Sequence, residues 1–467
     1  MKFIKGVFVV FCLVFILDLN AQYELVFGDQ NINEKAIASH QMSDGSFWIV
    51  GFTNSGTNGD ADVSITRYDS NGNVLFPLTY FGSSDNDYPN NMLYKEGRLI
   101  IAGETHKQNN NIDGFILVVD STGIFESFET YGLPGQTEQF FDIKATQDTG
   151  FVVSGFASLP NSVGNDFLMA KFNKRNLFEW SKIHDLGTND IGMVVTEKPQ
   201  GGYILVGDQL QSGGNYNVAL IGCDEMGNML WDTVVANPNN GGCRQVTIHD
   251  DQLIIVGEMS TATSAAFDLY LIRTDLQGNL IWQGTIPKTD NGDAAFDLIV
   301  KSLNEIYITG YSYVDSIKGT DMVVMEIDSV GNIINEIYFG GTSLDMGLDI
   351  KVQDDGYFMV SGFKSGESSN EYYVIYNSFD LINSVWSPQM SEDNFKPFYP
   401  NPTSDKVNFP EEFDNHEVVI SDELGRTFIM KMNHQQIDLS DFDSGKYWLF
   451  VKDNKGYTVH AQTVVKL

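Results

Sequence analysis

Basic side chains are scarce in this sequence. Its 467 residues include 28 Lys and Arg against 62 Asp and Glu, so the formal net charge at pH 7 is −34. A chain this acidic repels nucleic-acid phosphates and anionic lipid, and we exclude both as partners. Proline is also scarce, with 12 residues against 44 glycines, whereas Phe and Tyr together are abundant. This composition favours strands joined by turns, and a hydrophobic content of 42% is enough for a large core.

Long hydrophobic runs are missing except at the N-terminus. Lys2 and Lys5 precede the apolar run Gly6–Leu17, which is followed by the small residue Ala21. This arrangement is typical of a secretory signal peptide, and we expect cleavage between Ala21 and Gln22. A membrane anchor is the alternative, but a run of this length gives only about 18 Å of helix, too short for a hydrocarbon core of about 30 Å. We therefore expect no transmembrane segment in the mature chain.

Local catalytic motifs are missing as well. The sequence contains no G-x-S-x-G elbow, no H-E-x-x-H pair and no Walker loop. We therefore assign no catalytic residue and no cofactor, with calcium as a weaker possibility. Carboxylate pairs for glycoside chemistry stay open, because such pairs meet in space rather than in sequence.

A repeated unit occupies most of the chain. Two hydrophobic residues, a small residue and a glycine recur as WIVG, IIAG, VVSG, ILVG, IIVG, YITG and MVSG. The spacing between successive glycines is 50 to 53 residues. These marker glycines are Gly51, Gly103, Gly155, Gly207, Gly257, Gly310 and Gly362.

A second marker keeps the same phase. An Asp or Asn stands seven residues before another Asp or Asn, with a β-rich run between them, at Asp62/Asp69, Asp113/Asp120, Asp166/Asn173, Asn217/Asp224, Asp268/Asp275, Asp321/Asp328 and Asn370/Asn377. The second member often opens a turn such as DSNGN or DLQGN, which predicts a tight hairpin. A calcium loop is the alternative, but it needs further oxygen ligands that these turns lack.

Each repeat is expected to hold four strands. In the first repeat we place them near Lys35–Gln41, Phe47–Phe52, Val63–Tyr68 and Val74–Phe81. Several runs are apolar in both alternating phases, which indicates burial on both faces of the sheet. Four-stranded units of this length describe the blades of a β-propeller, so the sequence predicts an all-β fold with seven blades. The segment Tyr23–Asp29 resembles the end of a fourth strand and is expected to pair with the last blade.

Cysteine is rare, and the repeat decides its state. Cys12 lies in the signal peptide, which leaves Cys223 and Cys243 in the mature chain. Cys223 ends a third strand and Cys243 lies beyond the whole fourth strand, a rise of about 23 Å against a Cα limit of about 7 Å for a disulfide. We therefore predict two free thiols.

Function in a propeller depends on loops rather than on the blades. The loops between second and third strands are polar and largely uncharged, which suits recognition of a sugar or peptide and equally suits solubility alone. The blade-to-blade loops carry acids that could hold calcium or simply form a solvated surface: Asp29, Asp85, Asp87, Asp190, Asp290, Asp293 and Asp345. The acids of the second marker repeat from blade to blade, which favours a structural role for Asp62, Asp113, Asp166, Asp268 and Asp321.

The repeat stops near Phe395, and short strands separated by turns follow. They predict a small antiparallel, immunoglobulin-like sandwich. The segment contains FYPNPTSDKV (Phe398–Val407), VVISDELGR (Val418–Arg426), IDLSDFDSGKYWLFV (Ile437–Val451) and the terminal VVKL. It resembles the type A C-terminal sorting domain of the type IX secretion system of Bacteroidetes. The repeats also resemble the propeller repeats often placed before such domains.

That resemblance implies a route and a set of motif residues. The chain would cross the inner membrane by its signal peptide, and the type IX translocon and its sortase would act on the C-terminal domain. The product would be released or held at the cell surface after a cut between about Ser384 and Pro397. The positions that match the motif are Tyr399, Pro400, Asn401, Pro402, Gly425, Asp438, Leu439, Gly445, Tyr447, Lys466 and Leu467.

The sequence thus predicts a signal peptide at 1–21, a seven-bladed propeller at 22–384, a linker at 385–397 and a sorting domain at 398–467. We expect a secreted or outer-membrane surface protein that works as a non-catalytic binding or adhesion module for a glycan or protein. The alternatives are a polysaccharide-directed hydrolase or lyase with acids on the loop face, and a structural surface component.

Overall fold

The computed structural model describes most of the chain after residue 22. It covers residues 23–378 except for 29–31, 55–60, 70–71, 108–110, 134, 160–163, 188, 236–238, 261–265, 287–291, 316–318, 353–356 and 367–368. It also covers residues 406–466 except for 410–416, 423–426, 432–435, 441, 443 and 453–457. The contacts divide the chain into two compact units, one formed mainly by Glu24–Val352 and Met359–Ile375, the other by the residues from Tyr376 onward. The predicted signal peptide and the predicted linker lie outside the described residues.

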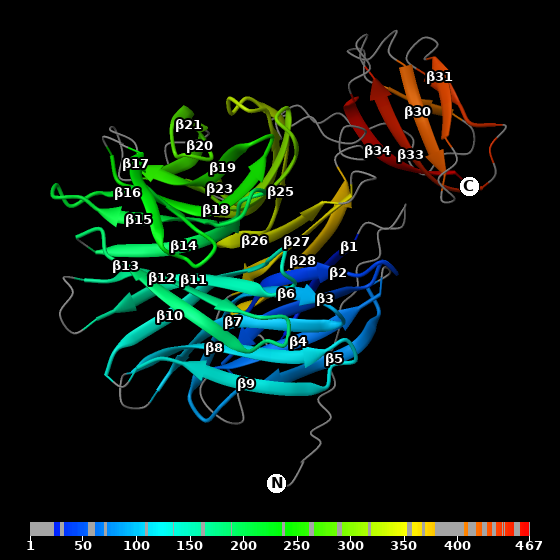
Figure 1. The fold of residues 1–467 in the computed structure, drawn as a ribbon. Helices are drawn as coiled ribbons and strands as arrows, with labels where there is room; N and C mark the ends of the chain where they lie inside the picture. The colour runs from blue at the N-terminus through cyan, green and yellow to red at the C-terminus, as the bar shows by residue number, and fades with distance from the viewer. Residues whose placement is uncertain are drawn as a thin grey trace. The chain divides into compact units, whose positions relative to one another are not determined.

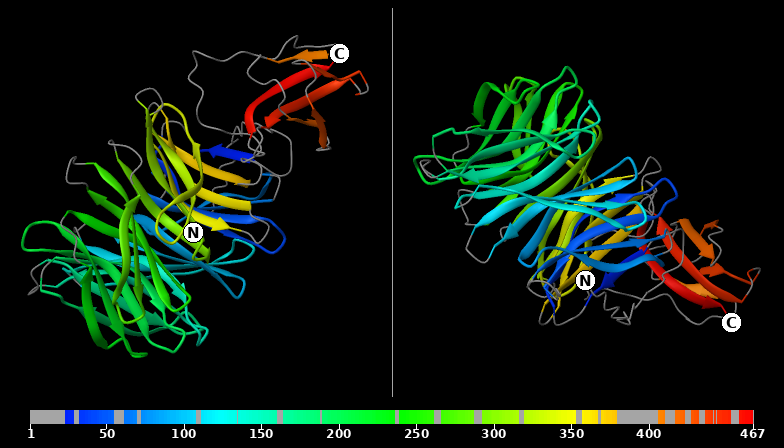
Figure 2. Two further views of the ribbon diagram at one scale, coloured as in Figure 1. Left: turned by 90° about the horizontal axis from the view of Figure 1, so that it is seen from above. Right: turned by 60° about the horizontal axis from the view of Figure 1, so that its bottom comes forward.

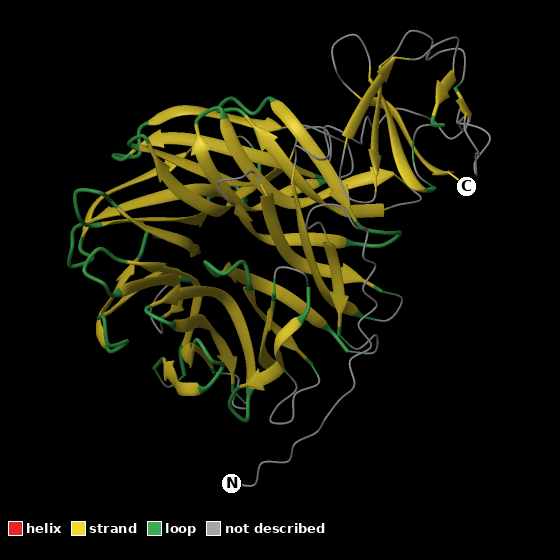
Figure 3. Ribbon diagram, turned by 90° about the vertical axis from the view of Figure 1, so that its right-hand side faces the viewer, coloured by secondary structure: helices red, strands yellow, loops and turns green. Residues whose placement is uncertain are grey.

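The described residues form an all-β structure, as predicted. Every regular element among them is a strand, and Figure 3 shows strands joined by loops throughout. Within this part of the chain no helix has the length and apolar character needed to cross a membrane.

The first unit repeats one motif, a four-stranded antiparallel meander. The first repeat consists of β2 (Glu34–Gln41), β3 (Phe47–Thr53), β4 (Asp62–Tyr68) and β5 (Val74–Phe81), which confirms the four strands expected from the sequence. The second consists of β6 (Asn86–Lys95), β7 (Arg98–His106), β8 (Ile112–Asp120) and β9 (Phe125–Tyr131). The third consists of β10 (Thr137–Ala145), β11 (Phe151–Ser158), β12 (Asp166–Phe172) and β13 (Phe178–His184). One parallel pair, Thr137 with Ile112, joins the second and third repeats.

The next three repeats follow the same order. The fourth consists of β14 (Asp190–Glu197), β15 (Tyr203–Leu210), β16 (Tyr216–Cys223) and β17 (Met229–Val235). The fifth consists of β18 (Gly241–His249), β19 (Gln252–Ser260), β20 (Phe267–Asp275) and β21 (Leu280–Ile286). The sixth consists of β22 (Asp293–Ser302), β23 (Glu305–Asp315), β24 (Gly319–Ile327) and β25 (Ile333–Phe339).

The last repeat takes its outer strand from the other end of the chain. Its sheet runs in the order β1 (Tyr23–Phe27), β28 (Asn370–Ser378), β27 (Tyr357–Ser365) and β26 (Asp345–Val352). Figures 1 and 2 show the blue N-terminal strands beside the yellow strands of this repeat. The predicted pairing of the N-terminal segment with the last repeat is confirmed for Tyr23–Phe27.

The first strands form the inside of this β-propeller. Each first strand contacts the first strand of the next repeat, and β26 contacts β2. At that junction Asp349 Oδ2 accepts hydrogen bonds from Ser39 N at 3.0 Å and from Ser39 Oγ at 2.6 Å. The last and first repeats are therefore joined by both packing and hydrogen bonds.

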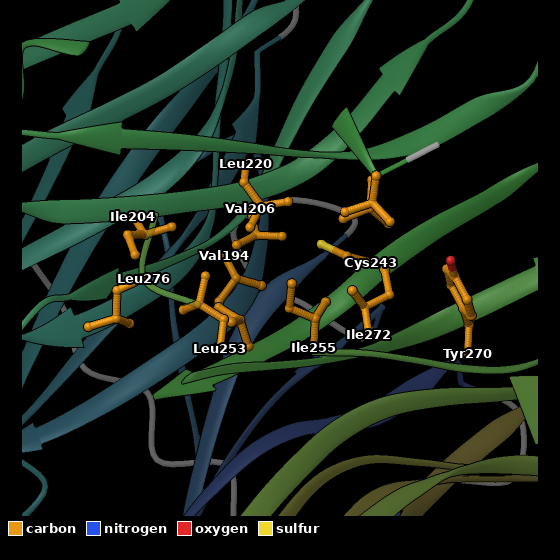
Figure 4. Packing of buried hydrophobic residues seen from close by; sticks show 13 residues of the cluster. Val194, Ile204, Val206, Leu220, Cys243, Leu253, Ile255, Tyr270, Ile272 and Leu276 are labelled. Carbon is orange, nitrogen blue, oxygen red and sulfur yellow. The ribbon is translucent and has the colours of Figure 1, made fainter. Parts of the chain in front are cut away.

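The hydrophobic core lies between neighbouring repeats. Strand β12 is buried along its whole length, which is the two-faced burial that the apolar runs predict. Figure 4 shows one such core, in which Val194, Ile204 and Leu220 of the fourth repeat pack with Leu253 and Ile255 of the fifth. Single sheets of this kind cannot shield both of their faces, so each repeat depends on its neighbours.

The Asp-first turns are hairpins, as predicted. Asp275 Oδ1 accepts hydrogen bonds from Gln277 N at 2.9 Å and Asn279 N at 2.8 Å, and Gly278 has a φ of +82°. The same carboxylate pattern occurs at Asp224 and Asp328. The oxygen atoms of these carboxylates therefore bind backbone amides of their own turns.

The two cysteines among the described residues are free, which confirms the prediction. Cys223 and Cys243 are buried and unbridged.

The second unit contains two small antiparallel sheets. β29 (Lys406–Asn408) pairs with β32 (Gln436–Asp438). The other sheet has the order β31 (Thr427–Lys431), β30 (Glu417–Asp422), β33 (Gly445–Lys452) and β34 (Thr458–Lys466). Its core includes Val418, Ile420, Leu439, Leu449 and Val451.

Candidate binding surface on the inner strands

Six of the seven first strands show a β-bulge at the same place in the repeat. The pairing register shifts between Ala36/Ala38, Pro89/Asn91, Phe140/Asp142, Gly192/Val194, Cys243/Gln245 and Ala295/Asp297. The residues inside these bulges are Ile37, Asn90, Phe141, Met193, Arg244 and Phe296, and Leu348 occupies the corresponding place in the last repeat. All seven are half-buried, whereas the residue before each of them is buried. A bulge redirects a side chain out of the alternating pattern, and bulges are common beside functional sites.

The marker glycines explain why the bulge can form. A Cβ added to any of them would lie 1.7 to 2.2 Å from a carbonyl oxygen of the facing first strand, for example 1.7 Å from the Gln139 oxygen at Gly155. None of the seven has a positive φ, so close approach of the backbones is what requires glycine here. The repeated glycine of the sequence and the repeated bulge are thus two sides of one backbone contact.

The seven bulge residues differ chemically although their backbone surroundings repeat. Three are apolar and non-aromatic, two are phenylalanines, one is an amide and one is a cation. In that order they are Ile37, Met193 and Leu348, then Phe141 and Phe296, then Asn90, and then Arg244. A framework role would ask for the same residue type in every repeat, as it does at the marker glycines. The backbone at this position therefore repeats from one first strand to the next, while the side chain differs.

Arg244 is the centre of the most polar part of this surface. Its guanidinium Nη2 forms an ion pair with the Glu258 carboxylate. The guanidinium carbon Cζ lies 5.8 Å from the centroid of the Phe296 ring. Burial opposes the charged form, but Glu258 and the neighbouring Asp208 raise the pKa of Arg244. Asp208 is buried, and its Oδ1 accepts a hydrogen bond from Cys243 N at 2.8 Å. Burial raises the pKa of Asp208 to about 7.

A second polar group surrounds Asn90. Its Nδ2 donates to Glu104 Oε2 at 3.3 Å and to the Phe140 carbonyl at 3.0 Å. Glu104 Oε1 lies 3.0 Å from His106 Nε2, and the His106 ring meets the Tyr88 ring edge-on at 5.1 Å. Amide, carboxylate, imidazole and phenol groups from two adjacent strands thus meet at one place.

Aromatic rings accompany the bulge residues on the second strands. Phe141 lies 5.6 Å from Phe156, and Phe296 lies 5.9 Å from Tyr311, measured between ring centroids. Lys35 Nζ lies 4.3 Å from the Phe363 ring. Phe363 is buried, whereas Phe141, Phe156, Phe296 and Tyr311 are half-buried, and such rings beside hydrogen-bonding groups are the usual composition of a small-molecule or saccharide site.

The position after the bulge has a different role. Asp142 Oδ2 accepts a hydrogen bond from Val195 N of the next repeat at 3.2 Å, and Asp297 Oδ2 does so from Ile350 N at 2.9 Å. Asp349 makes the same bond to Ser39. These buried carboxylates join neighbouring repeats through the backbone, so their role is structural.

The acids singled out in the sequence come together in pairs between repeats. A Cβ on Gly82 would meet both Asp62 and Asp87, and one on Gly340 would meet both Asp321 and Asp345. The blade-to-blade acids bind loop amides: Asp190 Oδ2 accepts from Leu186 N at 2.9 Å, and Asp345 Oδ2 from Gly341 N at 2.8 Å. Asp87 and Asp293 are also buried, and Asp85 is half-buried. Asp190 and Asp345 therefore cap loops, and the buried acids of this group do not form a solvated rim.

One group of acids has the geometry to hold a cation. Oxygen atoms of Asp166, Asp185 and Asp190 lie within 4.8 Å of one another. Hard oxygen ligands of this kind suit Ca²⁺ or Mg²⁺. Asp190 also caps its loop, so calcium stays the weaker possibility stated from the sequence, beside the prediction of no cofactor.

Several expected positions lie outside the described residues. They include Asp29 and Asp290, part of six of the seven second-to-third-strand loops, and the motif positions Tyr399, Pro400, Asn401, Pro402, Gly425 and Leu467. Ala21 and Gln22 also lie outside. Of these loops QSGGNYN, residues 211–217, is described in full.

Sequence reasoning looked for function on loops and missed the bulge residues. A signal for them exists, because they stand thirteen or fourteen residues before each marker glycine. That phase does not by itself identify the residue which the bulge turns outward. Only the register of strand pairing shows it.

The described motif positions of the C-terminal unit hold one loop together. Lys466 Nζ donates to the Ser440 carbonyl at 3.3 Å and also to the Phe442 carbonyl. Asp438 Oδ1 accepts from Ser440 N at 2.9 Å, and Leu439 is fully buried. Gly445 pairs with Lys466, and Tyr447 is buried against the ring of Phe442. Residues that are scattered in the motif thus meet around the loop that follows β32.

Comparisons with solved structures at low identity place this chain beside several enzymes and one propeller domain. An α-L-arabinofuranosidase of Fusarium graminearum has 10% identity and a TM-score of 0.46, covering 78% of this chain and 99% of that chain. The polysaccharide lyase Uly1 has 11% identity and a TM-score of 0.47, covering 74% and 90%. The β-propeller domain of the Trilobed protease from Pyrococcus furiosus has 9% identity and a TM-score of 0.43, covering 74% and 98%. Curated protein sequences contain no match.

A family model matches the C-terminal part of the chain. Residues 397–466 match the secretion system C-terminal sorting domain. This match confirms the sorting tail expected from the motif residues and supports export of the protein by type IX secretion.

Proposed function

We propose that the repeat region is a closed seven-bladed propeller which works as an exported, non-catalytic glycan-binding module. An immunoglobulin-like sorting domain would carry it through the type IX translocon to the cell surface or the medium. The ligand would contact the seven bulge residues and the aromatic rings beside them. The observation that carries this proposal is the difference among side chains at a position whose backbone is repeated in every repeat.

The chemistry of this surface favours a saccharide. Phe141, Phe296 and Tyr311 supply apolar area for sugar C–H groups, while the side-chain oxygens of Asn90 and Glu258 supply acceptors for hydroxyl groups. A site is normally built once, and an asymmetric ring of side chains provides one orientation for one ligand. A protein partner is the alternative outcome of the experiment below.

Binding of the purified mature chain to an array of immobilised glycans tests the proposal. We expect at least one glycan class to bind, and the variants Phe141→Ala and Phe296→Ala to weaken that binding at least about tenfold. Leu75→Ser, at a position 54% exposed on an outer strand, is the matched control and should bind as the parent does. Absence of any bound glycan, or equal loss in the control, would contradict the proposal.

A polysaccharide hydrolase or lyase is the second candidate. The observation that favours it is a pair of acids on adjacent repeats, Asp208 with its pKa raised to about 7 and Glu258 paired with Arg244. General acid–base chemistry on saccharides commonly uses two carboxyl groups in different surroundings. Release of new saccharide ends from the glycan that binds, lost in Glu258→Gln while binding persists, would favour this function over simple binding.

Export is tested separately from binding. A chain that lacks Phe398–Leu467 is expected to stay in the periplasm, whereas the full chain reaches the surface or medium and loses its tail between about Ser384 and Pro397. Mass analysis of the exported product locates the cut. Export of the truncated chain would contradict the role of the tail without affecting the binding proposal.

A further inference from the structure

A pocket lies between the fourth and fifth repeats at their short hairpin turns. Its volume is about 490 Å³, which is within the range of small-ligand sites. The lining comes from four places: the β14–β15 turn, the start of β17, the β18–β19 turn and the β20–β21 turn. The lining residues are Lys198, Gln200, Gly201, Trp231, Asp251, Leu276 and Gln277. None of them is a bulge residue, because they lie at the turns that follow or precede the strands.

The floor of the pocket departs from the repeat. The residue after the turn Asp is half-buried Ser121 in the second repeat and half-buried Ser329 in the sixth, but in the fifth it is Leu276. Leu276 is only 6% exposed and belongs to the core cluster between the fourth and fifth repeats, where Figure 4 shows it beside Ile204. The exchange of a small polar residue for leucine gives this turn an apolar base.

The β18–β19 turn also departs from the repeat. Asp250 and Asp251 both adopt left-handed backbone conformations, with φ of 49° and 56°. The corresponding turn of the second repeat has Glu96 and Gly97, where glycine takes the second position without steric cost. An aspartate held where glycine is preferred indicates that its side chain has a role, and the Asp251 side chain lines the pocket.

Trp231 is held in place from both sides. A Cβ on Gly222 would lie 2.0 Å from the indole Cε2, and one on Gly278 of the next repeat would lie 2.8 Å from Cζ3. Both neighbours therefore must be glycine for the indole to fit. A fixed, half-buried indole loses little entropy when a ligand packs against it.

The side chains that line the pocket include one cation, Lys198, and one carboxylate, Asp251, so their charges balance. Gln200, Asp251 and Gln277 are exposed, and Lys198 Nζ already donates to the Cys223 carbonyl at 3.0 Å. Two amides, one carboxylate and an apolar surface of Trp231 and Leu276 suit a ligand with several hydroxyl groups and C–H faces. We propose that this pocket binds a neutral saccharide residue, at a site separate from the inner strands.

The chain offers a matched control in the adjacent pair of repeats. Trp282 holds the position of Trp231 one repeat later, and its indole Cη2 would lie 3.5 Å from a Cβ on Gly331. There the turn residues are Asn304, Ser329 and Val330, in place of Asp251, Leu276 and Gln277. A tryptophan change at this position disturbs the same kind of contact between repeats without touching the pocket.

Isothermal titration of the purified mature chain with cellotetraose, xylotetraose, maltotetraose and mannotetraose tests the proposal. At least one of these is expected to bind with a Kd of about 1 mM or tighter. Asp251→Gly relieves the left-handed strain while it removes the carboxylate, so it should fold as well as the parent and bind at least about tenfold more weakly. Gln277→Ala should also weaken binding, and Trp282→Phe should leave it unchanged.

The outcomes separate this site from the inner strands. Retention of binding in Phe296→Ala together with loss in Asp251→Gly supports the pocket. Absence of binding by all four oligosaccharides would overturn the proposal. So would full binding by Asp251→Gly and Gln277→Ala, or an equal loss in Trp282→Phe.

Discussion

At the scale of single residues, the marker glycines show how a backbone requirement appears in a sequence. At all seven a carbonyl oxygen of the first strand approaches so closely that no Cβ fits, and six of them lie opposite a bulge. Because the neighbour is backbone, it cannot move aside without breaking the pairing of the sheet. A one-atom change should therefore be costly at these positions and harmless at an open glycine.

Gly155→Ala is expected to lower the free energy of unfolding by about 1–3 kcal/mol, because its Cβ would lie 1.7 Å from the Gln139 oxygen. Urea unfolding of the two proteins measures the difference. Gly213→Ala is the control, since no atom lies within 4 Å of a Cβ there, and it should change stability by no more than about 0.5 kcal/mol. Equal effects of the two substitutions would show that close backbone approach is not what selects glycine.

Asp208 should make stability depend on pH. Burial raises its pKa from an ordinary value of 3.8 to about 7, so the folded protein keeps a proton that the unfolded chain releases. The stability that this proton provides is complete below about pH 3.8 and is lost as the pH rises through about 7. Asp208→Asn keeps an oxygen that accepts from Cys243 N. The free energy of unfolding of this variant should fall by about 2–4 kcal/mol less than that of the parent as the pH rises. Unfolding curves between pH 4 and pH 8 measure it, with exposed Asp250→Asn as the control.

At the scale of elements, the closing sheet depends on a strand from the other end of the chain. β1 supplies buried Leu25 and Phe27, and the Phe27 ring stacks on Tyr372 of β28 with centroids 4.7 Å apart. Without β1 the edge of β28 and this apolar area would face water. The hairpin turns differ, because each is completed within a few residues by its own Asp and Gly.

Phe27→Ala is expected to lower the free energy of unfolding by about 3 kcal/mol, since it leaves a cavity between β1 and Tyr372. Thermal or urea unfolding measures the loss. Glu24→Gln, on the same strand but exposed, should stay within about 0.5 kcal/mol of the parent. If both variants were equally stable, β1 would contribute nothing to the last sheet.

At the scale of the whole molecule, stability is shared between repeats, because each core cluster described in the first unit is built from two of them. Cys223 lies in the cluster between the third and fourth repeats, and Cys243 in the cluster between the fourth and fifth. A reagent reaches either thiol only when neighbouring repeats separate. The two cysteines are thus built-in probes of opening of the ring.

Both thiols should resist alkylation in the folded protein. Burial raises the pKa of Cys223 to about 12 and that of Cys243 well above its ordinary value, so almost no thiolate is present at pH 8. Treatment with iodoacetamide at pH 8 should leave the intact mass unchanged without denaturant and add two labels in concentrated urea. Rapid labelling under native conditions would show that neighbouring repeats open readily.

The repeat made much of the architecture predictable. The spacing of the marker glycines, the Asp-first turns and the doubly apolar runs led to all-β repeats of four strands, and the phase of Cys223 and Cys243 led to free thiols. The candidate site was less accessible. Polar composition pointed to the loops, whereas Arg244 and Phe296 stand in strands and look in the sequence like ordinary strand residues.

The amino-acid order alone determined the local structure, the number of repeated glycines and the presence of the sorting tail, because propensity, turn chemistry and motif spacing act over short stretches of chain. Only the tertiary structure decided which side chains share a surface. Bulges turn Arg244 and Phe296 outward, Asp251 meets Trp231 across two repeats, and the paired acids are buried between neighbours. Those outcomes depend on register and on contacts between residues about fifty positions apart, and no local pattern encodes them.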